Sequence, residues 1–308
     1  MRIRPTAPLF TWFFPWLLPL LLAGCNPAYL LNDLVREGSV VRTADIAYEP
    51  GARHSLDIYQ PGPPGRSGTA DSARAPLPVI VFLYGGNWRT GDKDIYKFLG
   101  RTLAQRGAVV VVPDYRLVPE VVFPGFVQDN AAAVAWAVRH AAALGGDPRS
   151  VFVMGHSAGA YNAAMLALDP SYLAAQGLER NRLAGVVALA GPFDFLPITQ
   201  DDLKPVFAPV QDGPLSQPIT YADGTNPPML LLAGTADTTV QPRNTTSLTR
   251  RITERGGPVE SKLYPDLGHI GILTAFTPLF AGRAPVEDDV WGFVQRHRGA
   301  GRTTGQRP

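Results

Sequence analysis

Residues Val151–Gly159 read Val-Phe-Val-Met-Gly-His-Ser-Ala-Gly, and this stretch decides the fold. The apolar run at its start predicts a buried β-strand, and the residues that follow, Ala158–Leu168, predict a helix. Between them lies a Gly-x-Ser-x-Gly pattern centred on Ser157, with glycine where a side chain would block a sharp turn. A strand, a tight turn and a helix in this order expose a serine hydroxyl at the edge of a sheet. The pattern therefore predicts a nucleophilic serine in an α/β protein.

The remaining sequence alternates between strand and helix signals, and runs such as Val79–Leu83 are apolar throughout, as in strands buried on both faces. We expect one α/β domain, residues 40–297, with a mostly parallel eight-stranded sheet and helices on both faces. The proline-rich stretch Asp194–Pro227 predicts a small cap segment. The expected strands are Val40–Tyr48, Ser55–Tyr59, Pro78–Leu83, Ala108–Pro113, Val151–Gly155, Leu183–Ala190, Met229–Ala233 and Val259–Tyr264. The expected helices are Ile95–Gln105, Val127–Ala142, Ala158–Leu168, Asn244–Arg255 and Asp288–His297.

The N-terminal residues have the pattern of a targeting segment rather than of a folded element. Two arginines precede an apolar stretch, Pro8–Leu22, and Leu22–Cys25 resembles a bacterial lipobox that ends in the chain's single cysteine. We expect residues 1–24 to be a lipoprotein signal peptide, Cys25 to be lipidated, and residues 25–39 to form a tether. The protein would then lie in the bacterial cell envelope, at the outer membrane or the periplasmic face, and contact the membrane through this anchor.

This segment has two alternative interpretations, and the sequence argues against both. An uncleaved membrane span needs roughly 20 apolar residues, whereas this stretch is shorter and contains Pro15 and Pro19. Cys25 could also be a small buried residue after an ordinary signal peptide. The position of the only cysteine where a lipobox requires it argues against that reading.

The charge balance excludes a nucleic-acid binder. Without the first 24 residues, Lys and Arg together equal Asp and Glu together at 26 each, and without Arg296–Pro308 as well the net charge is −4. A slightly acidic body with no basic stripe does not suit a polyanion. Residues 298–308 are expected to form a basic, flexible tail. The single cysteine also excludes a disulfide framework, and no ligand spacing suggests a metal or an organic cofactor.

The base that a nucleophilic serine needs is best supplied by His269. Five histidines are present, and His269 alone follows Ser157 on a plausible loop, directly after a predicted strand. His156 lies inside the turn and should point away from the serine hydroxyl. The others precede the serine or lie in the charged C-terminal region: His54, His140 and His297.

The acid that orients this histidine is expected to follow the preceding strand. Asp237 fits that position, at the end of the run Met229–Gly234. Asp194 follows an earlier strand and Asp266 is close to His269 along the chain, and both remain alternatives. Tyr84–Trp88 follows another strand end, so its main-chain N–H groups, with that of Ala158, are expected to form an oxyanion hole.

Together these segments resemble the esterase and lipase branch of the α/β-hydrolase superfamily. The likeness is to hormone-sensitive-lipase-like, kynurenine-formamidase-like and isoprenylcysteine-methylesterase-like enzymes. It rests on Tyr84–Trp88, Gly91–Lys93, Pro113–Leu117, Gly145–Gly159, Gly191–Asp194, Gly234–Val240 and Gly268–His269. The resemblance implies an α/β-hydrolase fold, triad roles for Ser157, Asp237 and His269, and oxyanion contacts from Gly86, Asn87 and Ala158.

The sequence departs from the family pattern beside the active site, where His-Gly-Gly is replaced by Tyr84-Gly85-Gly86. Tyr84 and Trp88 are therefore expected to shape the substrate pocket. Asp114 and Arg116 are expected to brace loops, with a substrate clamp as the alternative. Aromatic side chains that could line an apolar acyl pocket are Trp88, Phe193, Phe195 and Phe207.

The predicted function is a serine carboxylesterase that cleaves small to medium apolar esters through an acyl-enzyme, with no cofactor. The partner is thus a small-molecule ester. Two alternatives remain: an aryl formamidase that uses the same triad, and a non-catalytic hydrolase-fold lipoprotein of the envelope.

Overall fold

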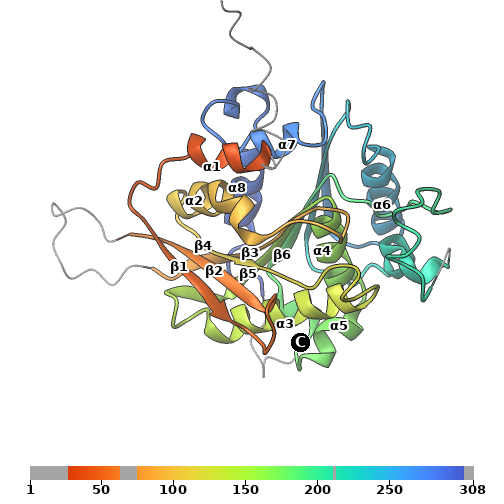
Figure 1. Cartoon of the computed structure of the whole chain (residues 1–308), viewed down its shortest axis with the longest axis horizontal. Helices are drawn as coiled ribbons and strands as arrows, with labels where there is room; N and C mark the ends of the chain where they lie inside the picture. Colours follow the sequence, from red (N-terminus) through yellow and green to blue (C-terminus); the bar gives the residue numbers. More distant parts are fainter. Residues whose placement is uncertain (1–26, 63–74, 211–212, 302–308) are drawn as a thin grey trace, which may run out of the picture.

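A computed structural model describes residues 27–62, 75–210 and 213–301 of the chain (Figure 1). The predicted signal peptide and Cys25 lie outside these residues. One eight-stranded sheet crosses the molecule in the order β1-β2-β4-β3-β5-β6-β7-β8. Its strands are β1 (Val40–Ala47), β2 (Ser55–Pro61), β3 (Leu77–Leu83), β4 (Val109–Pro113), β5 (Gly146–His156), β6 (Gly185–Leu189), β7 (Met229–Gly234) and β8 (Val259–Tyr264).

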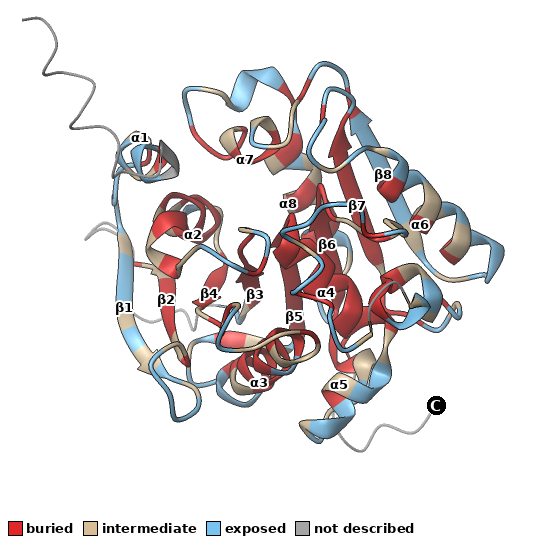
Figure 2. Ribbon diagram, turned by 45° about the vertical axis from the view of Figure 1, so that its right-hand side comes forward, coloured by how far each residue is buried: buried red, intermediate tan, exposed pale blue. Residues whose placement is uncertain are grey.

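The sheet is parallel from β4 to β8, and only the pairs β1–β2 and β2–β4 are antiparallel. The central strands β3 to β7 are buried almost throughout, whereas β1 and β8 at the two edges expose much of their length (Figure 2). This difference follows from position, because an edge strand has solvent on one side and a central strand is covered on both faces. The expected fold class, a mostly parallel α/β-hydrolase sheet, is confirmed.

Helices cover both faces of the sheet (Figure 1). α2 packs on β2 and β4 and α8 on β7, while α3 and α4 pack against β5 from the opposite face. The helices are α1 (Leu31–Leu34), α2 (Lys97–Gln105), α3 (Gly125–His140), α4 (Ala158–Leu168), α5 (Pro170–Ala175), α6 (Arg243–Glu254), α7 (Gly271–Thr274) and α8 (Val286–Arg296). All residues of α4 are buried, so this helix, which begins just after Ser157, forms part of the core.

The segment expected to be a tether is packed against the domain from Tyr29 onward. The Asn32 side chain accepts a hydrogen bond from the Phe98 amide and donates one to the Asp94 carbonyl. Leu31 and Val35 are buried. These contacts with the α2 region make the segment part of the folded body, because its apolar and amide groups find partners there.

The expected flexible tail also begins with ordered contacts. Arg298 donates to the Pro76 carbonyl at 2.8 Å, and the Gly301 amide donates to the Arg149 carbonyl at 2.8 Å. Residues 298–301 therefore belong to the domain, and residues 302–308 lie outside the described ranges.

The stretch expected to form a cap connects β6 to β7 and has no strand in its described residues. It contains two short 3₁₀ helices, Pro214–Ser216 and Pro218–Tyr221. Val206 and Phe207 from this stretch are fully buried, so the segment is fastened to the domain by apolar contacts. Part of the stretch, between Phe195 and Leu203, lines a hollow that also contains Ser157.

Candidate active site

Ser157 lies at the sharp turn between β5 and α4. Its backbone has φ 56° and ψ −122°, a conformation that a non-glycine residue adopts only under strain. The turn is held closed by the Ser157 amide, which donates to the Leu189 carbonyl at 2.9 Å. A methyl group on Gly155 would overlap the Gly159 carbonyl, and one on Gly159 would overlap the Leu83 carbonyl. The two glycines of the pattern therefore allow the close approach of β3, β5 and α4.

The loop after β3 packs directly against this turn. A Cβ atom on Gly85 would lie 2.9 Å from the Ser157 Cβ, and Gly86 has φ +129°, which strains a residue with a side chain. The loop continues through Asn87 and Trp88, both at positive φ. These conformations bring the main chain of the loop beside the serine.

The structure brings Ser157, His269 and Asp237 together from three separate loops. His269 Nε2 lies 3.0 Å from Ser157 Oγ, and His269 Nδ1 lies 2.7 Å from Asp237 Oδ2. The second oxygen of Asp237 accepts hydrogen bonds from the amides of Thr239 and Val240 at 2.9 and 2.8 Å. The carboxylate is thus buried and oriented, with one oxygen left for the imidazole.

The two alternatives to Asp237, which are Asp194 and Asp266, have other hydrogen-bond partners. The amide of Asp194 donates to the Asn244 side chain, and the amide of Asp266 donates to the Thr235 hydroxyl. His269 Nδ1–H donates its hydrogen bond to Asp237 Oδ2 instead. The remaining histidines have different partners, which are Pro50 and Asp129 for His54, Trp136 for His140 and Glu260 for His297.

His156 makes a contact that the sequence did not reveal. Its Nε2 atom lies 3.0 Å from the main-chain oxygen of His269, and the two rings are 4.7 Å apart. Burial and the neighbouring His269 lower the pKa of His156 to about 3. The ring is therefore neutral near pH 7, and its Nε2–H donates to the carbonyl.

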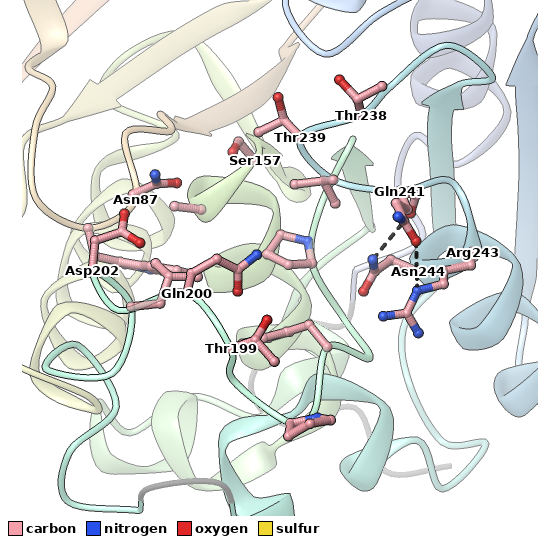
Figure 3. Close-up of a pocket in the computed structure, with 17 residues that line it drawn as sticks. Asn87, Ser157, Thr199, Gln200, Asp202, Thr238, Thr239, Gln241, Arg243 and Asn244 are labelled. Carbon is pink, nitrogen blue, oxygen red and sulfur yellow. Dashed lines mark hydrogen bonds between the residues drawn. The ribbon is translucent and has the colours of Figure 1, made fainter.

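Two hollows meet at Ser157. One has a volume of about 300 Å³ and lies between the β6–β7 segment and the start of α6 (Figure 3). The other, of about 550 Å³, contains His269, Gly86 and Ile270. Both are lined by Asn87 and Ser157, and Ala158 lines the first. The three residues expected to form an oxyanion hole thus surround the serine.

The two residues expected to shape the pocket have different positions. Trp88 lines the 300 Å³ hollow, and its Nε1–H donates to Asn162 Oδ1 at 2.9 Å. Tyr84 lines neither hollow, and this expectation needs correction. It is fully buried, because its ring stacks between those of Tyr96 and Tyr115.

The Tyr84 hydroxyl instead belongs to a polar network behind the loop. It donates to Asp114 Oδ1 at 2.9 Å and accepts from Arg53 at 2.8 Å. Arg53 also donates to the carbonyls of Gly91 and Tyr115. Burial raises the pKa of Asp114, although this carboxyl also accepts from Tyr84 and from the Lys93 amide. The network connects the turn before β2 with the loop after β3.

Arg116 has a bracing position rather than a place in either hollow. Its guanidinium makes two hydrogen bonds to the Asp129 carboxylate, at 2.9 and 2.6 Å. The Arg116 amide donates to the same group. Of the four aromatic residues considered for the pocket, Trp88 and Phe195 line the 300 Å³ hollow, while Phe193 and Phe207 are core residues.

The BD-FAE family matches residues 56–252, which is more than half of the chain and includes Ser157 and Asp237. The chain belongs to the BD-FAE family. The matched region runs from β2 into α6, so His269 lies beyond it. The resemblance to α/β-hydrolase esterases that the sequence indicated is confirmed by this match.

Similar proteins carry esterase names. The probable isoprenylcysteine alpha-carbonyl methylesterase ICME of Oryza sativa is 26% identical over 265 residues, which cover 80% of this chain and 62% of the rice protein. The probable carboxylic ester hydrolase LipM of Mycobacterium tuberculosis is 29% identical over 216 residues, which cover 64% of this chain and 48% of LipM. This BD-FAE chain thus spans about half to three fifths of these relatives.

A solved structure shows the same fold. Esterase B of Lactobacillus rhamnosis superposes with a TM-score of 0.71 at 21% identity, over 88% of this chain and 90% of that one. In the part of this BD-FAE protein that the structure describes, no helix has the length and apolar character needed to cross a membrane. Among the same residues, no group of three or more His, Cys, Asp or Glu side chains has the arrangement of a metal site.

Proposed function

We propose that this BD-FAE protein is a serine carboxylesterase. The observation that carries the proposal is the hydrogen-bonded chain from Ser157 Oγ through His269 to Asp237, at the meeting point of two hollows. The esterase names of the relatives support the same reaction class. A serine hydroxyl is a weak nucleophile by itself, and an imidazole within hydrogen-bond distance removes its proton as it attacks.

In the proposed mechanism, Ser157 Oγ attacks the ester carbonyl while His269 Nε2 takes the hydroxyl proton. Asp237 holds His269 in the tautomer with hydrogen on Nδ1 and stabilises the imidazolium that forms. The alcohol leaves with the proton that His269 returns, and Ser157 keeps the acyl group. His269 then activates a water molecule, whose oxygen enters the released acid.

The negative charge that develops on the carbonyl oxygen needs donors on the side away from His269. We assign this role to the N–H groups of Gly86, Asn87 and Ala158, because their residues surround the serine. Each such donor contributes roughly 3–4 kcal/mol to the stability of the transition state in comparable enzymes. The positive φ of Gly86 and the tight turn at Ser157 support this assignment, because both bring main chain close to the serine.

The sequence predicted small to medium apolar esters, and Trp88 and Phe195 supply an apolar part of the wall of the 300 Å³ hollow. Because most of its other lining residues are polar, we propose small to medium esters without restricting them to apolar ones. Hydrolysis of p-nitrophenyl esters from acetate to palmitate, with Ser157→Ala as control, tests the function. Serine-dependent turnover supports it, and the chain length of the optimum defines the pocket. Turnover that is equal in the wild type and in Ser157→Ala, or absent from both, would contradict it.

We also propose that the protein is lipid-anchored through Cys25 in the bacterial envelope. The basic, apolar and lipobox-like pattern of residues 1–25 supports this proposal. Metabolic labelling with a clickable fatty acid should mark the wild type and not Cys25→Ala. Equal labelling of the two proteins would overturn the anchor while leaving the esterase proposal unaffected.

A further inference from the structure

The two hollows at Ser157 bind different parts of an ester, an inference that rests on the proposed esterase function. The leaving alcohol must receive its proton from His269 Nε2, so it belongs in the hollow that contains His269 and Ile270. The acyl group then extends into the other hollow, between the β6–β7 segment and α6. That 300 Å³ space is therefore the acyl site.

The acyl site is lined largely by polar side chains. Seven of its neighbours are proline or other apolar residues, but amides, hydroxyls and two charged groups make up the rest (Figure 3). A straight alkyl chain would leave these groups without partners, because it offers no donor or acceptor. The polar lining residues besides Ser157 are Asn87, Thr199, Gln200, Asp202, Thr238, Thr239, Gln241, Arg243 and Asn244.

Arg243 is the positively charged group of the acyl site. Its Nε donates to the neutral Gln241 side chain at 3.1 Å, and none of the ion pairs found within the described residues includes this guanidinium. The first turn of α6, which begins at Arg243, has no acidic residue. An arginine whose terminal N–H groups face a polar hollow is suited to bind a carboxylate with two parallel hydrogen bonds.

The backbone that carries Arg243 is fixed by its buried neighbour. Asn244 Oδ1 accepts from the amides of Phe193 and Asp194, each at 2.9 Å, and its Nδ2 donates to the Gln241 carbonyl. These bonds join the start of α6 to the chain just after β6. The backbone position from which Arg243 extends is therefore fixed relative to the acyl site.

Asp202 supplies the only negative charge among the lining residues of the acyl site and lies across the hollow from Arg243 (Figure 3). It also lines the His269 hollow, at the junction of the two. Arg89 lies on the other side of this junction, where its guanidinium donates to the Asp202 main-chain oxygen at 3.4 Å, so the cation of the acyl site itself is Arg243. This arrangement of charge orients an acyl chain that ends in a carboxylate.

We propose that the acyl part of the substrate carries a second carboxylate, which Arg243 binds, so that the substrate class is monoesters of dicarboxylic acids. Hydrolysis joins the oxygen of water to the acyl carbon and releases the alcohol. The other product is the free dicarboxylate. Because the Arg243 side chain is exposed, solvent and salt screen the attraction, and we expect a preference of about tenfold rather than several orders of magnitude.

The test compares two methyl esters of the same shape. Monomethyl glutarate ends in a carboxylate, and methyl 5-methylhexanoate has an isopropyl group in its place. The specificity ratio is kcat/KM for the first divided by kcat/KM for the second, measured by proton release. Arg243→Gln should lower this ratio about tenfold, and Arg243→Glu should lower it further because it repels the carboxylate.

Arg250→Gln is the matched control. Arg250 lies on the same helix, is exposed and pairs with Glu254 at 3.8 Å, away from both hollows. It should leave the ratio at its wild-type value. An unchanged ratio in Arg243→Gln, with both esters still hydrolysed by Ser157, would overturn this inference and leave the esterase proposal standing. Absence of Ser157-dependent hydrolysis of every ester tested would overturn both.

Discussion

The Nε2 atom of His156 lies 3.0 Å from the main-chain oxygen of His269 and holds the loop of the proposed base from behind. The His156 side chain is buried, and its Nδ1 has no hydrogen-bond partner among the described residues. The bond to His269 is therefore the polar contact that fixes the ring. Since a shift of a base by 1 Å can cost about 100-fold in rate, this contact should matter for turnover.

We expect His156→Phe to lower kcat about tenfold or more, because the imidazole of His269 loses the hydrogen bond that supports its loop. Glutamine can place an amide N–H where the His156 Nε2–H lies. His156→Gln should therefore recover most of the lost turnover. Equal kcat values for the phenylalanine and glutamine variants would contradict a role through this hydrogen bond.

The same histidine should make the stability of the protein sensitive to acid. Its pKa is lowered from an ordinary value of 6.5 to about 3 in the folded state, by burial and by His269. Between these values the unfolded chain binds a proton that the folded chain does not. The free energy of unfolding therefore decreases as the pH falls, by up to about 1.4 kcal/mol per pH unit from this group.

Thermal unfolding measured from about pH 7.5 to about pH 4.5 checks this contribution. The melting temperature of the wild type should fall more steeply than that of His156→Gln, which has no group to protonate. His140→Gln, at an exposed histidine, should follow the wild type. Parallel curves for the wild type and His156→Gln would show that burial of His156 has no such effect.

The hydrogen bond between Asp237 and His269 predicts which acid supports turnover. Asp237→Asn should reduce kcat by about four orders of magnitude, because an amide at this position favours the wrong histidine tautomer. Asp266→Asn is the control, since Asp266 is exposed and its main-chain amide, not its carboxylate, donates to the Thr235 hydroxyl. Ester hydrolysis by the two variants decides between them. A larger loss in Asp266→Asn would reject the proposed triad.

Much of the fold follows from local sequence signals. The predicted limits of the helix Ala158–Leu168 and the strand Val259–Tyr264 agree with the structure at both ends. Turns rich in glycine or proline bound both elements, so their limits are encoded nearby. β5 begins at Gly146, earlier than predicted, because its first residues pair with β3 at Leu77 rather than showing an apolar pattern of their own.

Short helices and contacts between distant segments were harder to predict. α5 and α7 have six and four residues, too few for a helical repeat to be recognised. Arg53 reaches Tyr84 across 31 positions, and nothing beside Arg53 in the sequence indicates this partner. The polar wall of the acyl site likewise combines residues 199–203 with residues 238–244, which are far apart in the sequence. The aromatic residues alone therefore led to the expectation of an apolar pocket.

Gly159 should be the most restrictive position of the turn at Ser157. A methyl group there would overlap the Leu83 carbonyl and press on that of Tyr84, which belong to the strand and loop beside the serine. Backbone atoms cannot rotate away as a flexible side chain can, so the loop itself must shift. We expect Gly159→Ala to destabilise the fold by about 3 kcal/mol or more and to displace the proposed oxyanion donors.

Gly282→Ala is the matched control, since among the described residues nothing beyond the adjoining chain lies within 4 Å of the added methyl group. It should change the melting temperature little and leave ester turnover intact. Gly159→Ala should lower the melting temperature, and any protein that remains folded should show a lower kcat because the Leu83–Gly86 backbone sets the donor positions. If Gly159→Ala kept both the melting temperature and the kcat of the wild type, close packing of β3 against the turn would not be what positions the oxyanion loop.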